Sequence, residues 1–406
     1  MDGDLDGIND GPAEDETELL DPGEMNTDDV HMRESEIQTE TLELRYKAKE
    51  DDFQKLKLLG QGGYGQVFLV KKKHSPHEGK VFAMKVLRKA KIVSSEKDTA
   101  HTKSERNILG KINHPFIVNL HYAFQTSGKL FLVLEYVQGG EIFMMLENKG
   151  LLPESEVKLY LGQITLALGH LHEVGIIFRD LKPENILIGA DGHVKLIDFG
   201  LCKERGSNDE KTFTYCGTIE YMAPEVITKQ GHDQSADWWS LGTLMYDMLT
   251  GSPPFCADSR RETTRMVLHG RISLPHHLSA EAKDLLKNLL KRNSVSRLGA
   301  GSDDAKEVQR HSWFRDIDWD KLFNKELPMP YIPEITSIED VSNFDPTFTE
   351  RPIHAESPSF TPLNMKQDPF TGFTFTEELP ESFYRVDKGL EFISERERRR
   401  RLQQLS

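Results

Sequence analysis

Uninterrupted apolar runs first appear after Phe53, and the earliest of them are short. Residues 67–70 (Val-Phe-Leu-Val) and 81–84 (Val-Phe-Ala-Met) are apolar, and residues 71–80 between them are polar. Short runs rich in Val and Phe that are bounded by polar turns are typical of β-strands. Residues 130–134 form another such run. This part of the chain is therefore predicted to form a small sheet that contains a hairpin.

Helical periodicity begins between these strands and dominates after them. Residues 99–112 predict a helix, for which Asp98 is the expected N-cap. Farther along, apolar residues recur at spacings of four, three, four and three, as on one face of an amphipathic helix: Val157, Leu161, Ile164, Leu168 and Leu171. Helical patterns then continue to Phe314. The sequence therefore predicts an α+β fold with a small strand-rich lobe and a larger helical lobe.

Both ends of the chain lack this periodicity. Residues 1–52 hold nineteen Asp and Glu against four Lys and Arg, so they cannot bury enough apolar surface to offset the entropy of ordering, and we predict an acidic disordered tail. Residues 315–385 are rich in proline and predict an extended segment wrapped on the core. Residues 386–406 are predicted to be a charged, disordered end. The aromatic residues expected to anchor the wrapped segment are Phe344, Phe348, Phe360, Phe370, Phe373 and Phe375.

Composition narrows the class of protein. The net charge of the 406 residues is −15, but residues 1–52 account for all of it, so the rest of the chain is near neutral. We expect no direct contact with nucleic acid. No run of eighteen apolar residues and no signal peptide is present, which argues against a membrane protein. The three cysteines show no metal-ligand spacing and are typical of a reduced setting. We expect a cytoplasmic protein, with the nucleus as a second location.

A glycine-rich turn precedes the first predicted strand. Gly60, Gly62, Gly63 and Gly65 lie at a G-x-G-x-x-G spacing, and Val67 follows them. Glycine lets backbone N–H groups close over a phosphate because no Cβ intervenes. Dinucleotide-binding folds share this spacing, but there a helix follows, whereas here a strand follows. The pattern therefore favours a hairpin lid over the phosphates of a nucleotide.

The next predicted strand ends on a lysine. Lys85 closes the apolar run 81–84, and a lysine in that setting is costly unless it is paired. Glu105, on the helix predicted to follow, is the expected partner. Lys85 would then hold the α- and β-phosphates of the nucleotide, and Glu105 would hold Lys85.

Residues 177–185 (Ile-Phe-Arg-Asp-Leu-Lys-Pro-Glu-Asn) carry the strongest chemical signal. Asp180 can accept a hydroxyl proton or orient the hydroxyl, and Lys182 can neutralise charge on a phosphoryl group in transfer. Asn185 and Asp198, which begins an Asp-Phe-Gly motif, can supply oxygen ligands to Mg²⁺. Because phosphoryl transfer depends mostly on positioning and charge neutralisation, this small set suffices.

These motifs occur in the order typical of protein kinases. Residues 53 to about 376 resemble the AGC class of protein kinases, and within it the family of p70 ribosomal protein S6 kinases. The resemblance is also carried by residues 97–103, 105–109, 114–118, 215–225, 237–242 and 340–345. It implies a bilobal protein-kinase fold with the kinase domain at 53–314, a tail at 315–385 that carries regulatory motifs, and the use of ATP and Mg²⁺ to phosphorylate serine or threonine.

The resemblance also implies how nucleotide and substrate are held. Glu135 and its neighbours would form the hinge for adenine, with Leu134 as the gatekeeper, and Phe344 would lie near the adenine pocket. Glu141 would contact the ribose and a substrate arginine. The apolar residues expected around the adenine ring are Val67, Ala83 and Leu187. The carboxylates expected to select arginines in an R-x-R-x-x-S/T substrate are Glu141, Glu184 and Asp247.

Regulation is implied in the same way. Thr214 matches the activation-loop phosphorylation site, Ser357 the turn motif and Thr374 the hydrophobic motif. A phosphoinositide-dependent kinase is expected to phosphorylate Thr214. The target-of-rapamycin complex is an expected partner, although the aromatic motif by which the family docks on that complex is not evident in residues 1–52. The cations expected around a phosphate on Thr214 are Arg179, Lys203 and His101, and those expected near Thr374 are Lys97 or Lys103.

Two positions depart from the family pattern, and alternative functions stay open. Phe178 stands where the family has Tyr or His, and Ile197 stands where it usually has Thr. Another AGC kinase, a pseudokinase scaffold and a kinase of small metabolites are the alternatives. A pseudokinase typically lacks Lys85, Asp180 or Asp198, and all three are present. The long segment from 198 to 225 favours a peptide platform over a metabolite site, and we expect a monomer.

Overall fold

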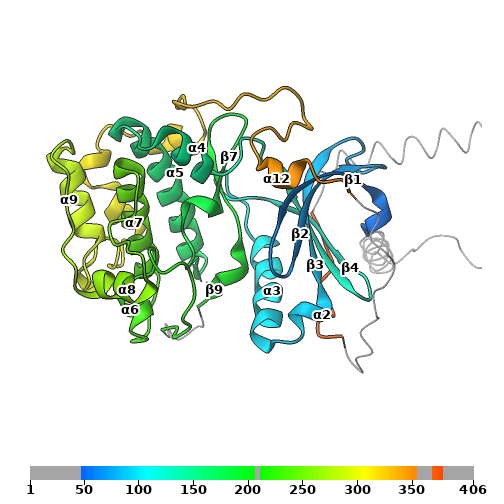
Figure 1. Cartoon of the computed structure of the whole chain (residues 1–406), viewed down its shortest axis with the longest axis horizontal. Helices are drawn as coiled ribbons and strands as arrows, with labels where there is room; N and C mark the ends of the chain where they lie inside the picture. The colour runs from blue at the N-terminus through cyan, green and yellow to red at the C-terminus, as the bar shows by residue number, and fades with distance from the viewer. Residues whose placement is uncertain (1–46, 206–210, 354–367, 378–406) are drawn as a thin grey trace, which may run out of the picture. The chain divides into compact units, whose positions relative to one another are not determined.

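An antiparallel six-stranded sheet forms the small lobe of the computed structural model, which describes residues 47–205, 211–353 and 368–377 (Figure 1). The strand order is β1-β2-β3-β5-β4-β10. The strands are β1 (Phe53–Gln61), β2 (Gly65–Lys72), β3 (Val81–Arg88), β4 (Leu120–Gln125), β5 (Lys129–Glu135) and β10 (Phe375–Thr376). The three strands predicted from apolar runs are present and longer than predicted, because the residues that flank each run continue the ladders.

The helix of the small lobe begins earlier than the sequence predicted. Helix α3 spans Glu96–Leu109, and its N-cap is Ser95, whose hydroxyl accepts the N–H of Asp98 at 3.2 Å. Asp98 was expected to be the cap but lies within the first turn, where its negative charge favours the helix N-terminus. A short helix, α2 (Lys89–Ile92), precedes α3 and was not predicted.

The large lobe is built around α5 (Glu154–Glu173) and α7 (Ser235–Thr250). The five apolar residues of the predicted amphipathic face are all fully buried on α5, and Trp238 and Trp239 of α7 are buried in the same core. The other helices are α4 (Ile142–Lys149), α6 (Pro224–Ile227), α8 (Arg260–His269), α9 (Ala280–Leu289), α10 (Ala305–Gln309), α11 (Trp319–Phe323) and α12 (Pro346–Thr349).

Short strands and 3₁₀ turns in the large lobe carry the chemically important segments. Strand β6 (Ile176–Ile177) pairs with β9 (Lys203–Glu204), and β7 (Ile186–Ile188) pairs with β8 (Val194–Leu196). The 3₁₀ turns of this lobe are η2 (Pro183–Asn185), η3 (Phe199–Leu201), η4 (Ser294–Ser296) and η5 (Ser312–Phe314), and a further one, η1 (Glu50–Asp52), directly precedes β1. These two-stranded ribbons hold residues 178–185 and 198–202 close together.

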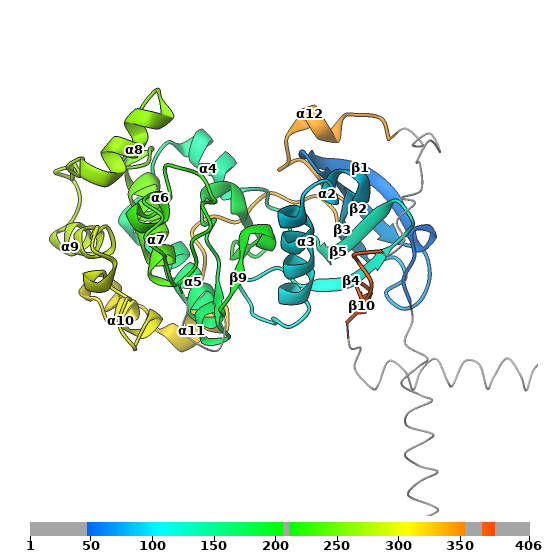
Figure 2. The ribbon, with the colours of Figure 1, turned by 90° about the horizontal axis from the view of Figure 1, so that it is seen from below.

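The segment after Phe314 returns to the small lobe, as its spaced aromatic residues predicted. Phe344 stacks on Tyr136 with ring centroids 5.8 Å apart, and Phe370 and Phe373 are buried. Figure 2 shows β10 beside β4, a pairing that two residues provide and the sequence did not predict. Ser357, Phe360 and the predicted end at 386–406 lie outside the described residues.

The last residues of the predicted acidic disordered tail, 47–52, are ordered against the small lobe. Residues 50–52 form η1, Asp52 is buried, and its carbonyl accepts the N–H of Lys73 at 2.8 Å. Residues 1–46 lie outside the described part of the chain. Within that part, no helix combines the length and the apolar character that a bilayer span requires.

Candidate active site

The glycine-rich turn joins β1 to β2 and lines a cavity of about 470 Å³. A Cβ added at Gly65 would lie 2.0 Å from the carbonyl oxygen of Val86, so this position admits only glycine because β2 and β3 approach closely there. A Cβ at Gly60, Gly62 or Gly63 would meet nothing within 4 Å. Packing therefore requires glycine at position 65, whereas the other three positions have open space beside the backbone.

Lys85 lies at the centre of this cavity and joins the two lobes. Its Nζ is 2.6 Å from a carboxylate oxygen of Glu105 on α3 and 3.3 Å from Asp198 of the large lobe. Burial alone would lower the pKa of Lys85, but Asp198 and Glu105 together raise it above its usual value. The same pairing with Lys85 lowers the pKa of Asp198. The predicted partner of Lys85 is thus in place, and Lys85 and Asp198 are held in their charged forms.

Asp180 is held from two sides within the predicted loop. Asn185 donates its Nδ2 to the Asp180 carboxylate at 2.8 Å and to the Asp180 carbonyl at 2.7 Å. The Lys182 Nζ lies 3.0 Å from the carboxylate and also donates to the hydroxyl of Thr218 at 3.1 Å. Only 7% of Asp180 is exposed, and Lys182 is near enough to Asp198 to stabilise its charge.

The loop backbone is anchored by a carboxylate that the sequence analysis did not single out as functional. Asp237 of α7 is fully buried and accepts the N–H groups of Phe178 at 2.9 Å and Arg179 at 2.8 Å. His172 donates to Asp237 at 2.9 Å and to Asp304 at 2.8 Å, and these bonds raise the pKa of His172 to about 9 against the effect of burial. The available signal was an aspartate directly before two tryptophans, Trp238 and Trp239, in a helical pattern.

The residues suit a magnesium ion that is held largely by phosphate oxygens. No group of three or more His, Cys, Asp or Glu side chains in the described ranges could hold a metal alone. The carbonyl of Asn185 accepts the N–H of Ile197 at 3.0 Å, which places Asn185 beside the residue before Asp198. One carboxylate and one amide oxygen are the small protein share that Mg²⁺ takes in nucleotide sites.

The side expected to receive adenine combines strands of both lobes. Ala83 and Leu134 are register partners on β3 and β5, and Leu187 of β7 bridges to Glu141. Glu135, predicted as a hinge residue, turns its carboxylate to Lys195 of β8 at 2.7 Å. Its N–H is donated to the carbonyl of Asn119 at 2.9 Å, so neither the carboxylate nor the N–H of Glu135 is free to contact a base.

The carboxylates expected to select arginine lie close enough to repel one another. Burial, followed by the negative charge of Glu184, raises the pKa of Glu141. Burial also raises the pKa of Asp247, although Tyr221 donates a hydrogen bond to it. An acidic cluster whose charges are incompletely compensated favours binding of an added cation such as arginine.

The surroundings of Thr214 differ in part from the expectation. The guanidinium of Arg179 donates to the carbonyl of Leu201 at 2.6 Å and to the hydroxyl of Thr212 at 3.4 Å, so it contacts Thr212 instead of Thr214. The pKa of His101 is lowered by burial and then by Arg179, Lys97 and Lys203. The expected cations therefore act on His101 together, and the charge of Asp98 offsets their effect only in part.

Thr374 is exposed, and the cation that contacts its main chain is not one of the expected lysines. Arg106 of α3 donates to the carbonyls of Phe373 at 2.9 Å and Thr374 at 2.6 Å, whereas Lys97 and Lys103 were expected there. Arg106 immediately follows Glu105, so the docked tail is attached to the helix that carries the partner of Lys85.

Comparison with known proteins agrees with this geometry. Residues 53–314 match the family model "Protein kinase domain", and residues 335–375 match "Protein kinase C terminal domain". Ribosomal protein S6 kinase beta of Caenorhabditis elegans is 54% identical over 340 residues, which are 84% of this chain and 61% of that protein. Human ribosomal protein S6 kinase alpha-3 is 48% identical over 349 residues, covering 86% of this chain and 47% of the relative.

The chain therefore belongs to the protein kinase family, whose members as a class use ATP with Mg²⁺. Within that family its two matched regions and its relatives confirm the resemblance to the AGC-class ribosomal protein S6 kinases. The chain spans about half of the length of these relatives, 61% of one and 47% of the other.

Proposed function

We propose that this protein is a serine/threonine kinase of the ribosomal S6 kinase type, which transfers the γ-phosphate of ATP to proteins with upstream arginines. The observation that carries the proposal is the arrangement of Asp180. Its carboxylate is oriented by Lys182 and Asn185, and Lys182 is also near enough to Asp198 of the Lys85 and Glu105 network to stabilise the charge of Asp198. A pseudokinase has no need to hold all of these groups together.

The residues of the chain divide the transfer between them. A substrate hydroxyl attacks the γ-phosphorus, the bond from that phosphorus to the ADP oxygen breaks, and the hydroxyl proton moves to Asp180. Lys85 positions the α- and β-phosphates, and Lys182 neutralises charge on the transferring group. Mg²⁺, held by Asp198 and Asn185, would supply charge neutralisation at the phosphates.

The acidic cluster supports an R-x-R-x-x-S/T preference. Glu141, Glu184 and Asp247 present carboxylates to which guanidinium groups bind in bidentate fashion, so lysine is a poor substitute for arginine. A small-subunit ribosomal protein is a substrate of the proposed class, by analogy with the names of the relatives.

The regulatory part of the proposal rests on the family resemblance. A phosphoinositide-dependent kinase would phosphorylate Thr214. The target-of-rapamycin complex would act upstream at Thr374, and Ser357 would be the turn-motif site. The protein would act as a monomer in the cytoplasm, with the nucleus as a second location.

A peptide-array assay tests the proposal. Protein phosphorylated at Thr214 should transfer ³²P from ATP to peptides with arginines upstream of Ser or Thr, and Asp180→Asn protein should not. Preference for acidic or proline-directed peptides would reject the proposed specificity. Equal activity of the Asp180→Asn protein would reject the proposed site.

A further inference from the structure

The tip of the glycine-rich turn, residues 60–65, makes few contacts through its main chain, and we call this turn the nucleotide lid. A Cβ at Gly62 or Gly63 would meet nothing within 4 Å, so open space surrounds these positions. Within the lid, the N–H of Gly62 donates to the carbonyl of Gly65 at 2.9 Å, and the main chain of β3 donates to the carbonyl of Tyr64 at 3.1 Å. Glycine adopts many backbone conformations at little steric cost. The position of the lid therefore depends on contacts that other elements make with it.

Two side-chain contacts connect the lid to α2 and α3. Lys91 of α2 donates its Nζ to the carbonyl of Gly63 at 2.8 Å. The next residue of the lid, Tyr64, donates its hydroxyl to the carboxylate of Asp98 in the first turn of α3 at 3.1 Å. That hydrogen bond raises the pKa of Tyr64, so the hydroxyl stays protonated and remains a donor. The lid is thus attached to two helices at successive residues.

The contact with Lys91 also sets the direction of a phosphate donor. In a trans peptide the C=O and N–H groups point in opposite directions, so a Gly63 carbonyl that faces Lys91 turns the N–H of Tyr64 away from it. Within the residues that the structure describes, the N–H groups of Gly63 and Tyr64 have no hydrogen-bond partner. Such N–H groups in a turn can donate to phosphate oxygens. Lys91 therefore orients a group that would hold the nucleotide and does not hold the nucleotide itself.

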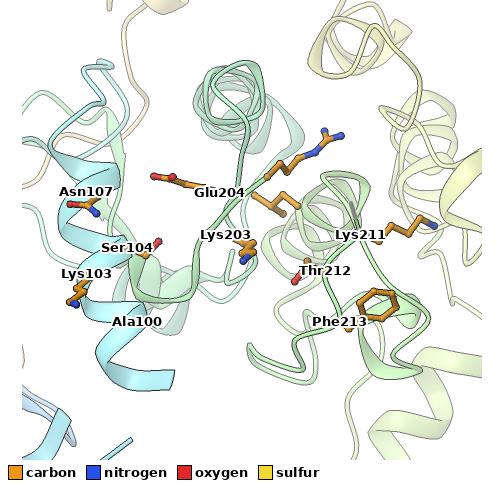
Figure 3. Close-up of a pocket in the computed structure, with 11 residues that line it drawn as sticks. Ala100, Lys103, Ser104, Asn107, Lys203, Glu204, Lys211, Thr212 and Phe213 are labelled. Carbon is orange, nitrogen blue, oxygen red and sulfur yellow. The ribbon is translucent and has the colours of Figure 1, made fainter. Parts of the chain in front are cut away.

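The bond from Tyr64 reaches the face of α3 that supports the phosphate site. Asp98, Thr102 and Glu105 are spaced by four and three residues, so they share one face of the helix, and all three line the nucleotide cavity with the lid. Glu105 on this face holds Lys85. Figure 3 shows residues of another face of α3, beside the segment that follows η3: Ala100, Lys103, Ser104 and Asn107.

Helix α2 is itself fixed by the C-terminal tail. Lys89, two residues before Lys91, is 2% exposed, and its Nζ lies 2.7 Å from the carboxylate of Asp368. The same Nζ donates to the side-chain oxygen of Gln125 on β4 at 2.6 Å and lies 5.7 Å from the centre of the Phe370 ring. A buried ammonium group is costly unless a charged partner compensates it. Docking of the tail therefore holds the helix from which Lys91 reaches the lid.

We propose that Lys91 is a positioning residue of the nucleotide lid, and that the docked tail strengthens nucleotide binding because it fixes α2. The bond from Tyr64 to Asp98 acts on the lid in the same way. This inference rests on the proposed kinase function, and it gives the tail an effect on the lid in addition to its contact with α3. Because Lys91 contacts neither the substrate nor the reacting atoms, its loss should raise the KM of ATP and leave kcat within about a factor of two.

Kinetics with an arginine peptide and calorimetric titration with MgADP test the inference on the full chain phosphorylated at Thr214. Lys91→Met keeps the length of the side chain but cannot donate, so the KM of ATP and the Kd of MgADP should each rise about threefold to tenfold. Tyr64→Phe keeps the ring and should have an effect of similar size. Lys91→Arg should restore both values. The matched control is Lys73→Met, an exposed lysine between β2 and β3, which should behave as wild type.

A double-mutant cycle tests the route from the tail. Asp368→Asn removes the charge that compensates Lys89, so it should raise the KM of ATP in the wild-type background. In the Lys91→Met background the same change should have a smaller effect, because the connection from α2 to the lid is already broken. Equal effects in the two backgrounds would show that the tail does not act on the lid through Lys91, and would overturn the proposed route.

The remaining outcomes separate this inference from the proposed function. Wild-type KM and Kd in both Lys91→Met and Tyr64→Phe, in a protein that phosphorylates the peptide, would overturn the inference alone. A lower kcat with an unchanged KM would place Lys91 in the transfer step and would also overturn it. A wild-type protein that neither binds MgADP nor phosphorylates the peptide would overturn the proposed function, and the inference with it.

Discussion

At the scale of single residues, the candidate site depends on side chains that are charged, partly buried and fixed by neighbours. Arg179 and Asp198 both have positive φ, 70° and 62°, which non-glycine residues adopt rarely. These strained conformations flank the catalytic loop and the magnesium segment. The hydrogen bonds from Arg179 to Asp237 and from Lys85 to Asp198 offset that strain.

Replacing Asp180 separates nucleotide binding from chemistry. Asp180→Asn keeps the size of the side chain but cannot accept the hydroxyl proton, so turnover should fall by about 10²–10⁴-fold while the Kd of ATP changes little. Steady-state kinetics and nucleotide titration check both quantities. Asp198→Asn is the matched comparison, and it should weaken magnesium-nucleotide binding as well. Wild-type turnover in Asp180→Asn would remove Asp180 from the mechanism.

The acidic cluster should make substrate affinity depend on pH. The pKa values of Glu141 and Asp247 are raised, so these groups take up protons at a higher pH than an ordinary carboxyl group. Only the ionised form binds arginine, so the KM of an arginine peptide should rise as pH falls toward these pKa values. Glu141→Gln should raise KM at neutral pH and flatten this dependence. An unchanged pH profile of KM in that variant would show that Glu141 does not contact the substrate.

At the scale of elements, α5 and α7 fix the catalytic loop through His172 and Asp237. The imidazolium of His172 lies between the carboxylates of Asp237 and Asp304. Removal of His172 therefore leaves the buried charge of Asp237 without its charged partner. Breaking one side of a buried ion pair typically costs about 3–5 kcal/mol. The catalytic loop is thus attached to the most buried helix of the large lobe.

This arrangement gives a pH test of stability. The pKa of His172 is raised from about 6.5 in an unfolded chain to about 9, so the protonated form stabilises the fold. The contribution is complete below the unfolded pKa and is lost as pH rises through about 9. His172→Gln should lower the free energy of unfolding at pH 6, and its difference from wild type should shrink by pH 9.5, as measured with urea. A difference that stays constant over this range would show that His172 is neutral in the folded protein.

Much of the element structure could be predicted from the sequence, and the misses have local causes. The face of α5 was correct because five apolar residues repeat at helical spacing. The start of α3 was wrong because Ser95 and Asp98 are both good N-caps, and only the chain path selects between them. Strand β10 was missed because two residues carry no periodicity, and its existence depends on a partner strand far away in sequence.

The same limit applies to the site. The motifs identified Lys85, Asp180 and Asp198 because chemistry restricts those residue types and spacings. They could not identify Arg106 at the tail, because a surface arginine on a helix has no distinctive sequence context.

Docking of the tail is an element-scale contact that can be tested directly. Phe373 is 3% exposed and precedes Thr374, whose carbonyl is held by Arg106. Phe373→Ala should remove about 3 kcal/mol of packing, release the tail from α3 and lower kinase activity. Activity of protein phosphorylated at Thr214 and Thr374 checks this, with the exposed Thr371→Ala as the control. Full activity of Phe373→Ala would show that tail docking does not activate.

At the scale of the whole kinase domain, the two lobes are joined behind the hinge as well as through the cleft. Lys195 of β8 donates to Glu135 at 2.7 Å and to the carbonyl of Ile117 at 3.3 Å. The N–H of Asn119 approaches the same carboxylate at 3.4 Å. These contacts attach the end of β5 and the approach to β4 to the large lobe, so they fix the main chain that would receive adenine.

Loss of this attachment should affect nucleotide binding more than chemistry. Lys195→Met keeps the length of the side chain but leaves the Glu135 carboxylate without its partner, so the hinge loses its fixed position. The KM of ATP should rise by about tenfold, or roughly 1.4 kcal/mol, with kcat within about a factor of two. Lys195→Arg should restore the ion pair and the KM. Equal effects of Met and Arg would indicate a packing role instead.

The two-residue strand β10 has a consequence beyond activation. It covers the outer border of β4, whose backbone groups would otherwise face solvent: Phe375 pairs with Ala123, and the N–H of Glu377 donates to the carbonyl of His121 at 2.9 Å. Phe370 and Phe373 are buried beside it. Unpaired edge strands beside an apolar surface are templates with which strands of other chains pair. The docked tail therefore also protects the protein against aggregation. A kinase whose tail is released should become prone to aggregate at the same moment that α3 loses its contact with the tail.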